Sequence, residues 1–205
     1  MGDSHDRSLY VSTLSRLAGQ DAAATSQGAG IHTHERHVGG IYILQEYEMY
    51  LDNLYTRAKY LLDPPYVPFQ GNNQNLDYLE KVDTVIFDFR AWAAAGFNHG
   101  AMWTTQGHID HITAIFWALA EVRHRRRKLF KETGYGYPDL IIIWVGSVPW
   151  PDKYMPDMRT NTRLQYWDDL ANTEIEKINR HYQDEGGMID HLNVYVNFPL
   201  SESSA

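Results

Sequence analysis

The segment DLIIIWVGSV, Asp139 to Val148, is the strongest strand signal in the chain. It is a short apolar run rich in β-branched residues, and such a run is typical of a strand buried in a parallel sheet. VDTVIFDF, Val82 to Phe89, shows the same pattern. Two further strands are predicted, one in residues 38–47 (VGGIYILQEY) and one from His191 to Phe198 (HLNVYVNF).

Helical segments alternate with these strands. Apolar residues recur at helical spacing in residues 5–18, 46–62, 108–132 and 161–182. The inward-facing residues expected in the longest segment are Ile112, Ile115, Phe116, Leu119 and Val122. Because strands and helices alternate, we predict an α/β fold with helices on both faces of a mostly parallel sheet. Ligands of such sheets bind outside the carboxyl ends of the strands.

Length and composition restrict the class of protein. The chain has 205 residues, 43% of them apolar, and is expected to form a single domain over residues 1–205. Its formal net charge of −8 gives no basic surface for nucleic acid. No segment approaches the ~18–20 apolar residues of a membrane span, and residues 1–7 lack the apolar core of a secretion signal. The absence of cysteine slightly favours the cytoplasm. We therefore expect a soluble protein, with its oligomeric state left open.

Two compositional features each permit two interpretations. The basic run RHRRRK, Arg123 to Lys128, lies on the helix predicted at residues 108–132. It is either a solvated helix end whose cations complement the helix dipole or a contact for phosphate or a membrane. The aromatic content of 13% indicates either a core and sheet surface rich in rings or an aromatic-lined cleft for a sugar-like ligand.

The opening Gly2-Asp3-Ser4 directly precedes the first helical segment. Glycine permits a tight turn from a strand into a helix. A serine at a helix N-terminus places its own N–H where it can help to hold a developing oxyanion. The motif makes Ser4 a candidate nucleophile, although Gly-Asp-Ser is also a common turn.

Longer segments extend this pattern along the chain. They are GDSHDRS (Gly2–Ser8), IYILQEYEMYLDNL (Ile41–Leu54), VDTVIFDFRAW (Val82–Trp92), DLIIIWVGSVPWP (Asp139–Pro151) and MIDHLNVYVNF (Met188–Phe198). With these segments in this order, the chain resembles the GDSL/SGNH hydrolase superfamily, and within it the PC-esterase branch.

The resemblance implies a three-layer, flavodoxin-like SGNH fold and a serine esterase or acyltransferase. The substrate would be a small-molecule or carbohydrate ester, often an O-acetyl ester, and neither a metal nor an organic cofactor is implied. Ser4 would attack the ester carbonyl, a histidine would take its proton and an aspartate would orient that histidine. The catalytic candidates are Ser4 and Asp3. The candidates for the oxyanion hole or cleft are Gly2, Arg90, Trp92 and Ser147.

The sequence departs from the family pattern in three places. The family has an apolar strand before Gly-Asp-Ser and an Asp-x-x-His block after the last strand, whereas this chain begins at Met1 and ends at Ala205. We therefore expect either a domain truncated at both ends or a catalytically inactive relative that serves as a binding or scaffold protein. Arg90-Ala91-Trp92 stands where many members carry Gly-x-Asn. Arg90 is interpreted as an oxyanion donor or substrate contact on one view, and as a surface residue on the other.

The histidines provide weaker candidates. Asp190-His191 has the wrong spacing for the family's block, so a structural role is favoured over a substitute catalytic pair. His99 and His108 flank a loop containing Gly100 and Trp103, which either lines the cleft or lies on the surface. Two interpretations are open for His32, His34 and His37: a metal site for zinc, copper or nickel, or histidines that are solvated or lie on a sheet surface.

Overall fold

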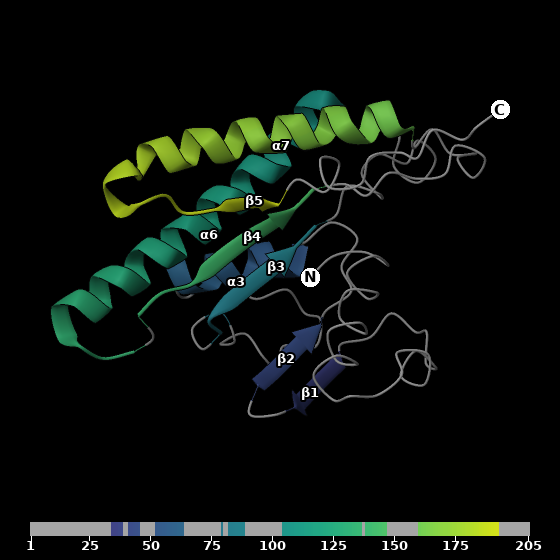
Figure 1. Ribbon diagram of the computed structural model, residues 1–205. Coiled ribbons are helices and arrows are strands. Elements are labelled where there is room, and N and C mark those ends of the chain that lie inside the picture. The colour runs from purple at the N-terminus through teal and green to yellow at the C-terminus, as the bar shows by residue number, and fades with distance from the viewer. Residues whose placement is uncertain are drawn as a thin grey trace.

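The computed structural model describes most of the central and C-terminal part of the chain (Figure 1). The described residues are 34–38, 41–45, 52–63, 79, 82–88, 104–136, 138–146 and 160–192, with only the backbone described for 34–38, 42–45, 52 and 53. The elements are β1 (His34–Val38), β2 (Ile41–Gln45), α3 (Asp52–Leu62), β3 (Thr84–Phe87), α6 (Thr105–Thr133), β4 (Ile141–Val145), α7 (Asn161–His181), the short 3-10 helix η2 (Gln183–Glu185) and β5 (Asp190–Leu192).

Strands β3, β4 and β5 form a parallel sheet in that order. The register places Phe87 beside Trp144, and Trp144 beside His191. In sequence α6 connects β3 to β4, and α7 connects β4 to β5. The predicted alternation of strands and helices around a parallel sheet is therefore confirmed for this part of the chain, which has an open, mixed α/β architecture.

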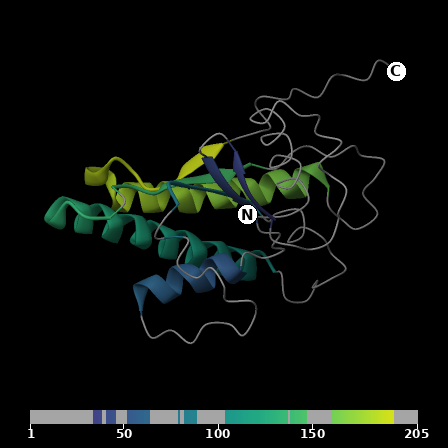
Figure 2. The same cartoon turned by 90° about the horizontal axis from the view of Figure 1, so that it is seen from below.

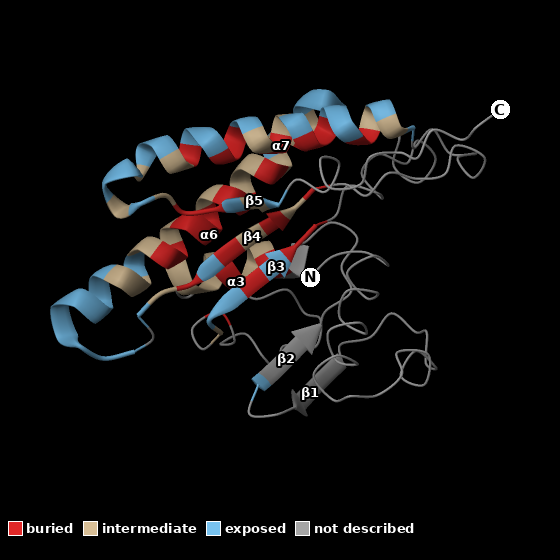
Figure 3. Cartoon of the chain, viewed as in Figure 1, coloured by how far each residue is buried: buried red, intermediate tan, exposed pale blue. Residues whose placement is uncertain are grey.

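The two faces of this sheet differ in burial (Figure 3). Val85, Phe87, Ile142 and Trp144 share the face that packs against α6 and α7, and all four are buried. On the opposite face, large apolar side chains are 39–50% exposed, namely those of Ile86, Ile141 and Leu192. Figure 2 shows α6 between α3 and the sheet, consistent with the packing of α3 against α6. Among the described residues, the prediction of a sheet covered on both faces is therefore correct for one face only.

Helix α6 is the central element of the core. Its predicted inward stripe is confirmed, because Ile112, Ile115, Phe116, Leu119 and Val122 are all buried. The side chain of Thr104 accepts a hydrogen bond from the N–H of Gly107 at the N-terminus, and Gly134 ends the helix at φ +70°. That conformation suits glycine, which has no Cβ to clash. Although α6 has 29 residues, no helix in the described part of the chain is long and apolar enough to cross a membrane.

Three aromatic rings meet where α6 contacts the sheet. The ring centroid of Trp144 lies 5.4 Å from that of Phe87 and 5.1 Å from that of Phe116, and the Phe87 and Phe116 centroids are 5.9 Å apart. All three pairs have the edge-to-face geometry that aromatic rings favour. For these rings the interpretation of the aromatic content as core is confirmed.

A separate antiparallel hairpin lies outside the parallel sheet. Its register pairs Val38 with Ile41, so only Gly39 and Gly40 connect β1 to β2. Gly-Gly is a typical two-residue connection between paired strands. The prediction of one strand across residues 38–47 is correct for β2, but it missed the second strand that pairs with it.

Arg126 of α6 binds the segments that lead into two strands. It donates hydrogen bonds to the carbonyl oxygens of Leu79 (2.9 Å), Val82 (2.8 Å) and Asp139 (2.7 Å). Val82 precedes β3 and Asp139 precedes β4. One guanidinium therefore joins the starts of neighbouring strands, at the amino edge of the sheet.

Two further arginines converge on the carboxylate of Asp139. Arg123 and Arg127 each donate two hydrogen bonds to it, at 2.8–2.9 Å, and Arg123 also donates to the carbonyl of Met188 just before β5 (2.6 Å). Paired, parallel hydrogen bonds of this kind are the strongest that arginine makes with a carboxylate. The interpretation of Arg123 to Lys128 as a solvated helix end is therefore wrong for Arg123, Arg126 and Arg127, whose head groups join the loops at the amino edge.

Asn179 of α7 fixes the entry into β5, and this gives a testable prediction. Its side-chain oxygen accepts hydrogen bonds from the N–H groups of Met188 (2.7 Å) and Ile189 (2.9 Å), while its amide donates to the Ile189 carbonyl (2.8 Å). We expect Asn179→Ala to lower the free energy of unfolding by about 2 kcal/mol, because the two N–H groups lose their acceptor. Urea denaturation followed by circular dichroism measures this.

Asn179→Asp is the matched variant: it keeps the acceptor oxygen, replaces the donor with a second oxygen and adds a negative charge. It should lose less stability than Asn179→Ala. Equal losses in the two variants would contradict the role assigned to the oxygen.

Candidate functional site at the carboxyl edge of the sheet

The carboxyl ends of β3 and β4 lie side by side. Asp88 and Gly146 directly follow these strands, and both are buried. Because α6 and α7 return toward the starts of the next strands, their N-termini lie at this same edge. Open parallel sheets bind their ligands outside this edge, so it is the candidate functional region.

A buried polar cluster lies beside this edge, between β4, β5 and α7. The indole N–H of Trp144 donates to Asp168 Oδ1 (3.1 Å), and Nε2 of His191 faces Asp168 Oδ2 (3.3 Å). Nδ1 of His191 faces Oδ1 of Asn172 (3.0 Å), whose amide nitrogen donates to Glu176 (3.3 Å). Asp168 is only 3% exposed. A buried carboxylate needs such donors, because removing it from water is costly.

The geometry shows what His191 can do. A general base needs a ring nitrogen within reach of the proton that it removes. Both ring nitrogens of His191 already face side-chain oxygens, so this residue joins β5 to α7. Its sequence neighbour Asp190 is exposed and is not its partner. The structural interpretation is thus confirmed, and a catalytic Asp190-His191 pair is wrong because the carboxylate that His191 meets belongs to Asp168.

The sequence contains a signal for this cluster that was missed. Asp168 and Asn172 are one helical turn apart, and Asp168 directly follows the core residue Trp167. Polar residues three or four apart on one helix side can act together. Their position beside an apolar stripe indicates a polar contact facing the core.

His108 lies in the first turn of α6 and is fully buried. Its ring centroid is 3.8 Å from that of Trp167, and the guanidinium carbon of Arg163 lies 5.5 Å from the same tryptophan ring. The side chain of His108 therefore packs inside the protein, while the loop that it flanks, His99 to Trp103, predicted either to line the cleft or to lie on the surface, is outside the described residues.

The structure does not describe the residues predicted to carry catalysis. Outside the described residues are Gly2, Asp3, Ser4, Arg90, Trp92 and Ser147. The same holds for His32 and for the side chains of His34 and His37. Within the part of the chain that the structure describes, no three His, Asp or Glu side chains gather as a group that could hold a metal ion.

Comparisons with known proteins gave no relative: no family model matches the chain, and no match was found among curated proteins or solved structures.

Proposed function

We propose that the chain is the body of a serine esterase or acyltransferase of the SGNH type, similar to the PC-esterase branch. Its substrate is an acyl ester, such as an O-acetyl group on a carbohydrate. The proposal combines the Gly-Asp-Ser motif with the parallel arrangement of β3, β4 and β5.

The observation that carries the proposal is the adjacency of the carboxyl ends of β3 and β4. In the sequence, Arg90 and Trp92 follow within a few residues of the end of β3, and Ser147 follows closely after β4. The segments to which the resemblance assigns the oxyanion hole thus follow two strands that are hydrogen-bonded neighbours. That is where an α/β sheet binds a substrate.

The chemistry requires a base in addition to the nucleophile. Ser4 Oγ would attack the ester carbonyl carbon while a base takes the hydroxyl proton, and N–H donors would hold the oxyanion. Collapse of the tetrahedral intermediate expels the alcohol, and water or a second alcohol then accepts the acyl group from Ser4. Both ring nitrogens of His191 already face side-chain oxygens of α7, so the proposal assigns the role of base to another histidine.

The proposal is tested by labelling with a fluorophosphonate and by hydrolysis of p-nitrophenyl acetate. We expect labelling at Ser4, loss of labelling in Ser4→Ala, and a fall in kcat/KM of at least about 1,000-fold, since a serine hydrolase without its nucleophile keeps only residual catalysis. The matched control is Ser8→Ala in the same GDSHDRS segment, which should keep both labelling and turnover.

Circular dichroism should show the same helix content in wild type and both variants. Unchanged turnover in Ser4→Ala would remove Ser4 from the mechanism. A folded wild-type chain that is neither labelled nor active would contradict the proposed esterase activity and favour an inactive binding or scaffold protein.

A further inference from the structure

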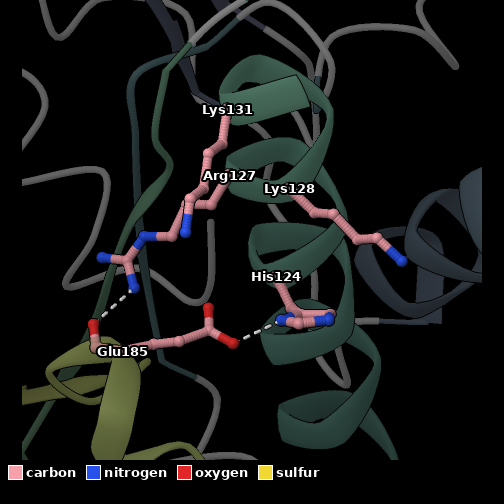
Figure 4. A pocket seen from close by; sticks show the side chains of 5 residues that line it. All are labelled: His124, Arg127, Lys128, Lys131 and Glu185. Atoms are coloured by element: carbon pink, nitrogen blue, oxygen red, sulfur yellow. Dashed lines mark hydrogen bonds and ion pairs between the residues drawn. The ribbon is translucent and has the colours of Figure 1, made fainter. Parts of the chain in front are cut away.

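Four basic residues lie on one side of α6, at its C-terminal half. His124, Arg127, Lys128 and Lys131 have the spacing i, i+3, i+4, i+7, which places them on one face of a helix. They line a pocket of about 340 Å³ together with Glu185 of η2 (Figure 4). Small-molecule sites typically begin at about 300 Å³. The pocket lies at the amino edge of the sheet, at the opposite end from the proposed esterase site.

Two contacts hold η2 against α6 and fix the shape of the pocket. Arg127 donates to the carbonyl of Glu185 (2.9 Å), while its Nε and Nη2 bind Asp139. Nδ1 of His124 and the Glu185 carboxylate are 2.5 Å apart. Arg127, His124 and Glu185 are each 24–34% exposed, so this wall of the pocket is partly shielded from water.

Lys128 and Lys131 differ from the other two basic residues on this side of α6. Both are exposed, and within the described part of the chain neither forms an ion pair, whereas Arg127 and His124 each meet a carboxylate. Lys128 and Lys131 are three residues apart on the helix, where like charges repel each other by a few tenths of a kcal/mol. In a chain of net charge −8, this pocket therefore keeps an excess of positive charge.

We propose that this pocket binds a phosphate group. Lysine ammonium groups bind phosphate as point charges. The aliphatic stems of Lys128, Lys131 and Arg127 supply apolar walls beside them. Glu185 opposes such a ligand through its negative charge. Removing a lysine charge and removing the Glu185 charge should therefore change the affinity for phosphate in opposite directions.

The test is titration of the full chain with inorganic pyrophosphate in an isothermal calorimeter at low salt. We expect saturable binding that weakens as sodium chloride is added, because salt screens exposed charges. Lys131→Gln and Lys128→Gln should each raise Kd about fivefold, the effect of one nearby surface charge. Glu185→Gln should lower Kd. Lys59→Gln on α3 is the control, since it changes the net charge equally but lies outside the pocket.

A second measurement distinguishes the two sources of a phosphate group. Co-sedimentation with phosphatidic acid vesicles, against phosphatidylcholine vesicles, tests a lipid headgroup, while pyrophosphate tests a soluble ligand. Binding to either probe that depends on Lys128 and Lys131 supports the proposal. The absence of saturable binding to both probes would overturn it, as would an equal loss of affinity in Lys59→Gln. Neither result depends on whether the chain is an esterase.

Discussion

We expect Trp144→Ala to lower the free energy of unfolding by about 4–5 kcal/mol. The side chain is fully buried and contacts Phe87 on β3 and Phe116 on α6, so its removal leaves a cavity between the sheet and the helix. The substitution also removes the indole N–H that donates to buried Asp168. Because small domains are stable by about 5–15 kcal/mol, this loss would unfold a marginal chain.

Trp144→Phe separates the two contributions. It keeps a ring in the aromatic cluster and removes the donor to Asp168, for which we expect a loss of about 1–3 kcal/mol. Urea denaturation is followed by far-ultraviolet circular dichroism, since the substitution alters tryptophan fluorescence. If Trp144→Ala failed to fold, Trp144→Phe would still test the hydrogen bond. A loss below about 0.5 kcal/mol, the range of ordinary surface substitutions, would contradict the role of the indole N–H.

The elements that the sequence predicts correctly are those with a local signal. The stripe of α6 repeats at helical spacing over many residues, and the run Ile141–Val145 is a short apolar segment bounded by polar and glycine residues. Both patterns arise because one side of the helix, or of the strand, is buried. They can therefore be recognised in the sequence without knowing which element packs against that side. Strand β1 carries four charged or titratable residues in HERHV and has no such signal, although Gly39-Gly40 could have indicated a hairpin.

The interactions that the sequence does not predict join residues far apart in the chain. Arg126 binds carbonyl groups 44 and 47 residues away, and a backbone carbonyl carries no side-chain signature. His191 meets Asp168, 23 residues away, although its neighbour Asp190 offers the same carboxylate. Only the packing of α7 on β5 selects between the two aspartates. From the sequence, the run Arg123 to Lys128 is recognised only by its positive charge. In the fold its arginines act as hydrogen-bond donors.

The second large effect is expected at the amino edge, in Asp139→Asn. Hydrogen bonds from Arg123, together with those from Arg127 and the Leu140 N–H, hold the pKa of Asp139 well below its usual range, although partial burial acts in the opposite direction. The substitution leaves two guanidinium groups without their anion. Breaking a buried pair costs about 3–5 kcal/mol and an exposed pair at most about 1. Because the Asp139 side chain is 35% exposed, we expect an intermediate loss, about 2–3 kcal/mol at pH 7.

The pH dependence of this loss identifies its cause. A carboxylate whose pKa is lowered by folding stabilises the protein above its unfolded pKa of about 3.9. That contribution declines as the pH falls further, toward the folded pKa. The difference in unfolding free energy between wild type and Asp139→Asn should therefore be constant from pH 7 to about pH 5 and shrink below about pH 4. Asp169→Asn, at an exposed position on α7, is the control and should change stability by less than about 0.5 kcal/mol. A difference that persists undiminished at pH 2–3 would mean that the substitution acts through packing, because the charge on Asp139 would then contribute nothing to the loss.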